Sequence, residues 1–323
     1  MLKKVFKAMC NNSISPVSVI IPTKNEGQQI KECLSAIFNQ SLKPLEVIVV
    51  DGLSTDDTVN EAAKFKVKIV TETEPTSLPN ARNVGVKIAA GEIVLIMDAD
   101  VILDKNCISN AMKCFEDPDT IAVIPYEQNL AHSKLEKIQI DWYRGSANPI
   151  RSGIGITVFA EFLRKAVFDK IAFDPNLGYG EDEDFQRRLL KIYGSSGKVV
   201  RSQGSVISVH YSHTFKELRS QYTWYGRTFS KFLNKKILLK PLLNLGSLLA
   251  PFLFIILLTV NIFFPPLLPV SVLLGILIIF RNLLICYRSR SWGFFQFIAF
   301  EFARSLFFTR GLVQGLFSKK RGR

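Results

Sequence analysis

Hydrophobic and polar positions alternate between two spacings over residues 17–125. Short apolar runs rich in β-branched residues indicate four strands, at residues 17–21, 46–50, 67–71 and 92–97. Helical periodicity fills the intervals, from about Gln28 to Phe38, over residues 57–65, and from Ser77 to a stop at Gly91. This alternation predicts an α/β fold with a mostly parallel sheet flanked by helices.

A second group of elements is expected after residue 125. The pattern predicts a helix near residues 163–171, a helix with an acidic start at GYGEDEDFQRR (178–188), and a strand, VISV (206–209), before His210 and His213. Residues 144–156 are rich in Gly, Ser and Arg and predict a mobile loop. We therefore predict a basic tail (1–15), an α/β domain (16–230, with halves at about 16–125 and 126–230) and a third region (231–323).

The third region has the composition of a membrane segment. No charged residue occurs in the 40 positions from Pro241 to Phe280, which accommodates two membrane helices of about 20 residues each. Because PPLLP (265–269) would break a single helix, we predict a hairpin of helices at about 242–264 and 267–287. The alternative is a hairpin buried in a soluble protein, which would need far more chain to cover it.

The charge distribution also favours a membrane location. Of the formal net charge of +13, residues 1–200 contribute −2 and residues 201–323 contribute +15. Basic residues precede the predicted hairpin, and others lie near its end or follow it, but none lies in its middle loop: Lys231, Lys235, Lys236, Lys240, Arg281, Arg288 and Arg290. This asymmetry predicts a multi-pass protein of the cell membrane whose first 240 residues are cytoplasmic, with a basic surface that suits anionic lipids.

The stretch WGFFQFIAFEFARSLFF (292–308) is mostly apolar but carries Glu301 and Arg304, at a spacing that allows an ion pair on one helix face. We predict an interfacial helix at about 292–310, and a third span is the alternative. The N-terminal MLKKVFK is too short and too charged to provide the core of a signal peptide. Five scattered cysteines without a CxxC pair indicate reduced thiols.

Polar residues cluster at the predicted carboxyl ends of the strands. They are Thr23, Asn25 and Glu26 after the first strand, Asp51 after the second, and Asp98 and Asp100 after the fourth. The carboxyl ends of parallel strands lie at one edge of a sheet, where ligands of such folds bind. We therefore predict one site along this edge.

Asp98 and Asp100 are candidate metal ligands. In an extended segment, residues two apart point the same way, and paired carboxylates suit Mg²⁺ or Mn²⁺, which prefer oxygen ligands and share them with phosphates. The spacing alone is weak, because Asp117 and Asp119 repeat it in what we expect to be a solvated turn.

The four carboxylates at residues 181–184 open a predicted helix. They would either stabilise the helix by lying at the positive end of its dipole, or provide a general base whose pKa is raised by its neighbours. Both interpretations stay open. Asp184 and Arg188 can pair one turn apart, which would leave Asp182 freer for chemistry. Arg82 and Asn83 are either surface residues or contacts to a nucleotide.

Taken in order, these motifs resemble a family-2 glycosyltransferase with the nucleotide-sugar-binding GT-A fold. The resemblance covers roughly residues 15–230, in the segments VSVIIPTKNEG (17–27), VIVVDGLSTDDT (47–58), NARNVG (80–85), AAGEIVLIMDADV (89–101), FLRKAVFDKIAFDPNLGYGEDEDFQRRL (162–189) and VISVH (206–210). One departure is at residues 51–54. Where the family often has Asp-Asp-Gly-Ser, this chain has Asp-Gly-Leu-Ser and so keeps one carboxylate.

The resemblance implies a role for each matching residue. The donor nucleotide would be bound by Thr23, Glu26, Asp51, Arg82 and Asp98. A divalent metal, Mg²⁺ or Mn²⁺, would be bound by Asp100. From its place after the strand VISV alone, His210 is either a structural residue or a further contact to a metal or a phosphate. Asp182 would be the catalytic base of an inverting transfer, with Glu181, Asp184 and Arg188 on the acceptor side.

The nearest resemblance is to membrane transferases that add a single sugar in polysaccharide or glycolipid assembly, including succinoglycan-type enzymes. The expected partners are a UDP- or GDP-sugar, a lipid-linked acceptor and membrane lipids. A processive synthase is the alternative, but its Gln-x-x-Arg-Trp motif is replaced here by Gln-Tyr-Thr-Trp-Tyr at residues 221–225. A membrane-anchored binding or scaffold protein is a further alternative. A nucleic-acid partner is not expected, because the basic residues flank membrane segments.

Overall fold

The computed structural model describes residues 15–72, 77–128, 131–146, 160–178, 180–194, 196–232 and 239–318. These fall into two compact units. The first contains the described residues of 1–129 and 152–210, and the second those of 130–151 and 211–323. The predicted basic tail, except Ser15, and most of the predicted loop at 144–156 lie outside the described residues.

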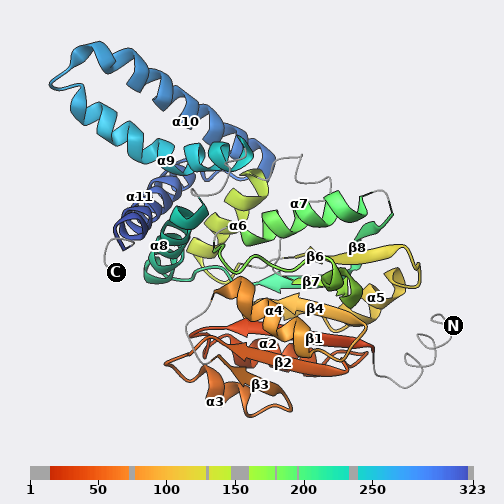
Figure 1. Cartoon of the computed structure of the whole chain (residues 1–323). Coiled ribbons are helices and arrows are strands. Elements are labelled where there is room, and N and C mark those ends of the chain that lie inside the picture. The colour runs from red at the N-terminus through yellow and green to blue at the C-terminus, as the bar shows by residue number, and fades with distance from the viewer. Residues whose placement is uncertain are drawn as a thin grey trace. The chain divides into compact units, whose positions relative to one another are not determined.

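The first unit is built on one eight-stranded sheet (Figure 1). Its strands are β1 (Val17–Thr23), β2 (Glu46–Asp51), β3 (Lys68–Thr71), β4 (Ile93–Met97), β5 (Val101–Leu103), β6 (Thr120–Glu127), β7 (Ala160–Arg164) and β8 (Lys198–Val209). The strand order is β3-β2-β1-β4-β7-β6-β8-β5. The first four strands in this order run parallel, as predicted, and β7 runs antiparallel between β4 and β6.

Helices of the first unit cover the sheet. They are α2 (Ile30–Phe38), α3 (Thr58–Ala62), α4 (Leu78–Ile88), α5 (Cys107–Cys114), the 3-10 helix η2 (Lys165–Asp169) and α7 (Glu181–Tyr193). Apolar residues of α4 and α7 pack on one face of the sheet, against a buried row that includes Ile20, Ile96 and Leu163. The alternate residues of these strands point to the other face and are buried too. Burial on both faces explains the continuous apolar runs in the sequence.

The predicted helix near residues 163–171 is wrong. Residues 160–164 form β7, which pairs antiparallel with β4, and only residues 165–169 turn into a short 3-10 helix. Phe162 and Leu163 are adjacent and both are buried, because β7 is covered on both faces. A continuous apolar run of this kind does not distinguish a buried strand from a helix.

The second unit is helical. Its elements are α6 (Lys134–Ser146), α8 (Phe215–Phe232), α9 (Leu239–Val260), the 3-10 turn η3 (Pro265–Leu267), α10 (Leu268–Ser289) and α11 (Phe294–Ser318). The two prolines of η3 separate α9 from α10 at the predicted break. Among the described residues, one helix, at 265–289, is long and apolar enough to cross a membrane, and a shorter apolar stretch occupies 249–260. The multi-pass topology therefore stays a prediction.

The expected ion pair between Glu301 and Arg304 does not form. The carboxylate of Glu301 is fully buried and binds Arg281 of α10 instead, at 3.0 Å from Nη1. Helical spacing shows which residues share a face of α11, but it carries no information about charges on a neighbouring helix. Arg304 is therefore not the ion-pair partner of Glu301.

Candidate active site

The loops that follow β1 and β2 are tied together at the carboxyl edge of the sheet. The side chain of Asn25 accepts a hydrogen bond from the backbone N–H of Thr55 at 2.8 Å, and the backbone N–H of Glu26 donates to the hydroxyl of Thr58, also at 2.8 Å. Asn25 has a φ of 58°, a left-handed conformation that Asn adopts at low cost. These contacts hold Glu26 beside the strand ends.

Thr23 and Asp51 lie side by side, because they are partners in the register of β1 and β2. The carboxylate of Asp51 accepts hydrogen bonds from the backbone N–H of Ser54 at 3.3 Å. The hydroxyl of Thr23 is buried and has no hydrogen-bond partner among the described residues. Both residues therefore stand at the predicted edge, and Thr23 has an unused polar atom there.

Strand β4 ends at Met97, so Asp98 and Asp100 occupy the short link to β5. Asp98 accepts a hydrogen bond from Arg82 Nη2 at 3.1 Å. Asp100 Oδ1 is buried without a partner among the described residues. Its backbone oxygen accepts a hydrogen bond from the backbone N–H of His210 at 2.9 Å.

His210 thus lies next to Asp100 through the backbone. Its Nε2 is 3.4 Å from a carboxylate oxygen of Glu32 on α2. The prediction that His210 binds a metal or a phosphate is untested.

Carboxyl groups crowd this edge and raise one another's pKa. Burial, together with the charges of Asp98 and Asp56, raises the pKa of Glu26 to about 7. Burial raises the pKa of Asp100 well above its usual range, and the charges of Asp98 and Glu26 add to the effect. Without a nearby positive charge, some of these carboxyl groups would therefore stay protonated at neutral pH.

Arg82 is the buried cation of the site. It projects from α4 and is 2% exposed, and its Nη1 donates to Glu181 Oε1 at 3.0 Å while Nη2 donates to Asp98. Its guanidinium lies over the ring of Phe173, 5.3 Å from the centroid. Burial alone would lower the pKa of Arg82, but the charges of Asp98 and Glu181 outweigh it, so the side chain stays charged. Its Nε is buried without a partner among the described residues.

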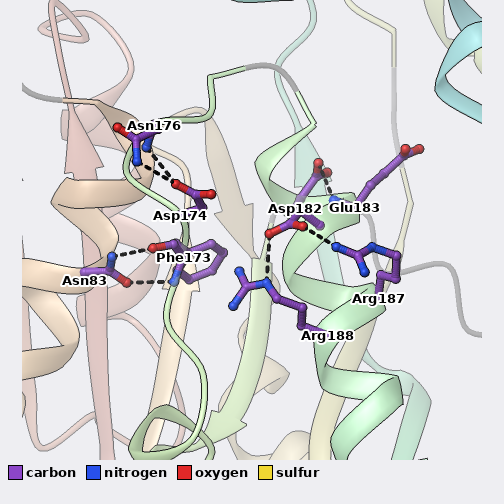
Figure 2. Close-up of polar contacts among 9 residues, drawn as sticks. Asn83, Phe173, Asp174, Asn176, Asp182, Glu183, Arg187 and Arg188 are labelled. Carbon is purple, nitrogen blue, oxygen red and sulfur yellow. Dashed lines mark hydrogen bonds and ion pairs between the residues drawn. The ribbon is translucent and has the colours of Figure 1, made fainter. Parts of the chain in front are cut away.

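Helix α7 delivers the acidic motif to the same edge. Gly180 precedes it with a φ of 82°, a conformation that favours glycine. Asp184 is paired with Arg188 Nε at 2.8 Å and with Arg187 Nη2 at 2.7 Å. Asp182 accepts a hydrogen bond from the backbone N–H of Glu183 at 2.8 Å (Figure 2), and both arginine contacts go to Asp184 instead.

Asn83 supports the loop that leads to α7. Its side chain accepts a hydrogen bond from the backbone N–H of Phe173 at 2.9 Å and donates one to the backbone oxygen of the same residue at 2.8 Å (Figure 2). The two neighbouring residues Arg82 and Asn83 of α4 therefore have different roles. Arg82 contacts the acidic groups, and Asn83 fixes the chain beside them.

Glu161 is a site residue that sequence reasoning missed. It lies on β7 opposite Ile96 of β4, is fully buried, and has no hydrogen-bond partner on either oxygen among the described residues. Burial and the charge of Asp182 raise its pKa to about 8, although Arg82 lowers it. The signal in the sequence was a single acidic residue within the apolar strand AEFLR.

The arrangement has more negative groups than positive ones. Two carboxyl groups contact Arg82 directly and two others, Glu161 and Asp182, act on it electrostatically. Burial and Asp182 raise the pKa of Glu181 despite its ion pair, because one guanidinium is shared among several acids. A buried site of this composition suits cationic or hydrogen-bond-donating ligands.

A divalent metal fits the residues present. Asp98 and Asp100 provide hard oxygen donors, and Asp100 Oδ1 is buried with no partner of its own among the described residues. A cation beside these groups would favour their ionised forms.

A sheet of this topology with an acidic carboxyl edge agrees with the expected GT-A fold. The sequence model of the family described as "Glycosyl transferase family 2" matches residues 18–171, so this part of the chain is similar to that family. The predicted α/β sheet with flanking helices is therefore confirmed, and the match supports the predicted family.

Similar curated proteins include the glycosyltransferase GlyG of Streptococcus pneumoniae, 29% identical over 113 residues, and a dolichol-phosphate mannosyltransferase of Pyrococcus furiosus, 35% identical over 113 residues. Each match covers 33% of this chain and 38% or 32% of the relative. The chain thus spans about a third of the length of these relatives.

Among solved structures, the chain resembles the mannosyltransferase PcManGT from Pyrobaculum calidifontis in complex with GDP-Man and Mn²⁺. The TM-score is 0.55 at 20% identity, over 94% of this chain and 88% of that one. At this identity the likeness concerns the fold.

Proposed function

We propose that the chain is an inverting, metal-dependent glycosyltransferase that moves a sugar from a nucleotide-sugar donor to a lipid-linked acceptor at the cytoplasmic face of a membrane. The observation that carries this proposal is the set of buried polar atoms without partners among the described residues, all at one edge of the sheet: Thr23 Oγ1, Arg82 Nε, Asp100 Oδ1 and both oxygens of Glu161. Buried polar atoms are rarely left unpaired unless a ligand completes them.

The donor side would be formed by the strand ends. Thr23 and Asp51 are partners in the register of β1 and β2, and Glu26 follows β1 at the same edge, where ligands bind in sheets of this kind; this supports the proposal. Arg82 and Asp98 would orient the ribose or the diphosphate. Relatives of similar fold bind such donors, as GDP-Man is bound in the Pyrobaculum calidifontis enzyme.

Asp98 and Asp100 would hold a divalent metal, with His210 as a further candidate. When bound, this ion supplies positive charge to the diphosphate leaving group. Mn²⁺ accompanies GDP-Man in the Pyrobaculum calidifontis structure, which supports a metal of the Mg²⁺ or Mn²⁺ type. The nearby carboxyl group of Glu26, with its pKa of about 7, would ionise more readily in the loaded site.

Asp182 would be the general base. It lies in the first turn of α7, free of the two arginines that engage Asp184. It would accept the proton of the acceptor hydroxyl as that oxygen attacks the anomeric carbon from the side opposite the diphosphate, which inverts the configuration. Glu181, Asp184 and Arg188 would flank the acceptor.

The acceptor is proposed to be lipid-linked because the second unit contains an apolar helix of membrane-spanning length at residues 265–289. The predicted multi-pass topology, with the sheet in the cytoplasm, belongs to this proposal. The dolichol-phosphate mannosyltransferase among the relatives is consistent with an acceptor of this class.

The test is transfer by the purified full chain, supplied with UDP- and GDP-sugars, a membrane lipid extract and Mg²⁺ or Mn²⁺. We expect Asp100→Asn and Asp182→Asn each to reduce turnover by about 100-fold or more. Asp119→Asn is the matched control, because it belongs to the other Asp-x-Asp pair and is exposed. Asp182→Asn should retain nucleotide binding. Undiminished turnover in both site variants would exclude the assignment, and nucleotide binding without turnover on any acceptor would favour a binding or scaffold role.

A further inference from the structure

A buried polar cluster lies among the helices of the second unit. Glu301 of α11 is fully buried, and its Oε1 accepts a hydrogen bond from Trp142 Nε1 at 3.1 Å and contacts Arg281 Nη1 at 3.0 Å. Its Oε2 accepts a hydrogen bond from Asn282 Nδ2 at 2.9 Å. Three partners from two other helices therefore occupy this carboxylate.

Arg304 lies one turn further along α11 and is left with unused donors. It is 5% exposed, and its guanidinium carbon lies 3.9 Å from the centroid of the Trp142 ring. Its Nε and Nη2 are buried and have no acceptor among the described residues. Stacking on an aromatic ring stabilises the charge but leaves the N–H groups, which point outward in the guanidinium plane, without acceptors.

The cluster also carries unbalanced charge. Arg281 and Arg304 contribute two positive charges, and Glu301 contributes one negative charge. The phenol of Tyr143, next to Trp142, stays neutral because burial raises its pKa well above the usual range. Arg281 is 31% exposed, so solvent screens its charge in part, but Arg304 is buried with two unpaired donors, and these favour an anion as their acceptor.

The geometry of the unpaired donors and the apolar surface of the surrounding helices indicate which kind of anion binds here. A guanidinium fork matches the oxygens of a phosphate group. On α10, large apolar side chains close to Arg281 in the sequence are more than half exposed, including Leu277 at 55% and Phe280 at 63%. Arg281 lies eight residues, or about 12 Å, from the Ser289 end of the helix, which the charge pattern assigns to the cytoplasmic side.

We propose that Arg304 and the cluster around Trp142 form a binding site for the phosphate group of a membrane lipid. This inference rests on the membrane location within the proposed function, but not on sugar transfer or on the residues at the sheet edge. It assigns Arg304 a ligand with a phosphate head and apolar chains.

The experiment uses the full chain in detergent micelles, with Trp224→Phe and Trp292→Phe introduced so that Trp142 is the remaining one of the three tryptophans. Its fluorescence is followed while phosphatidic acid is added, and diacylglycerol with the same acyl chains serves as the phosphate-free lipid. We expect a saturating change with phosphatidic acid alone. An equal response to diacylglycerol would overturn the proposal.

The residue is tested by Arg304→Gln, with Arg310→Gln as the matched control, because Arg310 is an exposed arginine of the same helix. Loss of charge-assisted hydrogen bonds should weaken phosphatidic acid binding by about 10- to 100-fold in the first variant and leave the second unchanged. Equal affinities in both variants would refute the assignment. If Arg304→Gln does not fold, Arg304→Lys replaces it, and there an unchanged affinity counts against the bidentate fork.

Two further measurements distinguish the possible sources of the phosphate. They also distinguish a failure of this inference from a failure of the proposed function. If inorganic phosphate alone reproduces the saturating change and phosphatidic acid does not, the lipid is excluded as the ligand. The assay contains no sugar donor, so lipid binding through Arg304 in a chain that transfers no sugar would contradict only the proposed function. Sugar transfer with no lipid response at Trp142 would contradict only this inference.

Discussion

Replacing Glu161 with Gln should remove a pH-dependent cost from the folded chain. Glu161 is fully buried on β7, and its carboxyl group has a pKa of about 8 when folded, against an ordinary value of 4.5. Between these values the folded state binds more protons than the unfolded state, so the free energy of unfolding falls as the pH rises. Above about pH 8 both states are ionised and the decrease ends. Gln keeps the size of the side chain and does not titrate.

The magnitude follows from the size of the pH interval. Each pH unit within the window is worth about 1.4 kcal/mol, so the advantage of the Gln variant should grow by about 3 kcal/mol between about pH 6 and pH 8. For a folded unit of 150–250 residues, 1 kcal/mol shifts the thermal midpoint by about 2–4 °C, which gives about 6–12 °C over this interval.

The assay is thermal unfolding of the full chain in detergent, in the presence of a chelator, at closely spaced pH values. The quantity of interest is the difference in midpoint between Glu161→Gln and the unmodified chain, because other titrating groups cancel in it. Glu116→Gln, which changes an exposed carboxylate of the same unit, should give a difference that does not vary with pH. A constant difference for Glu161→Gln as well would refute the reasoning about its buried proton.

Three other predictions concern the same unit. Leu53 has a φ of 62° where the family often has Gly, so Leu53→Gly should raise the free energy of unfolding by about 0.5–1 kcal/mol, as measured by denaturant titration. Asn83→Ala removes both hydrogen bonds to the backbone of Phe173 and should lower the free energy of unfolding by about 1–3 kcal/mol. Turnover should also decrease if the loop before α7 positions Asp182. A fully stable variant would contradict the role of this contact. Adding Mn²⁺ at about 100 times its dissociation constant should stabilise the chain by about 2.7 kcal/mol, and Asp100→Asn should abolish this shift while Asp119→Asn retains it.

The carboxyl edge of the sheet could be predicted from the sequence because local signals place it. Each strand of the parallel half is a run of apolar, β-branched residues, and each is followed directly by polar side chains. Parallel pairing then brings Thr23 next to Asp51 without further information. The end of β4 at Met97, immediately before Asp98, follows from the same pattern.

Features that depend on contacts distant in sequence were missed or mistaken. Glu161 joins the site only because β7 inserts antiparallel beside β4, and nothing in residues 160–164 specifies that neighbour. The pairing of Glu301 with Arg281 and Trp142 likewise depends on the packing of three helices, so helical spacing predicted the wrong partner, Arg304. In both cases local periodicity placed the residue on a face but did not determine what lies opposite that face.

The two clusters share a physical property that bears on function. In each, buried polar atoms lack partners within the described part of the chain, at Asp100 and Glu161 in one unit and at Arg304 in the other. An unpaired buried polar group costs about 1–3 kcal/mol, and more when it is charged, which is a large share of the net stability of a folded unit. The signs of the clusters differ, since the first has excess carboxyl groups and the second excess guanidinium. The first therefore favours a cation with its bound diphosphate and the second a phosphate group alone, so the two clusters would be stabilised by different ligands and should respond separately to metal and to lipid.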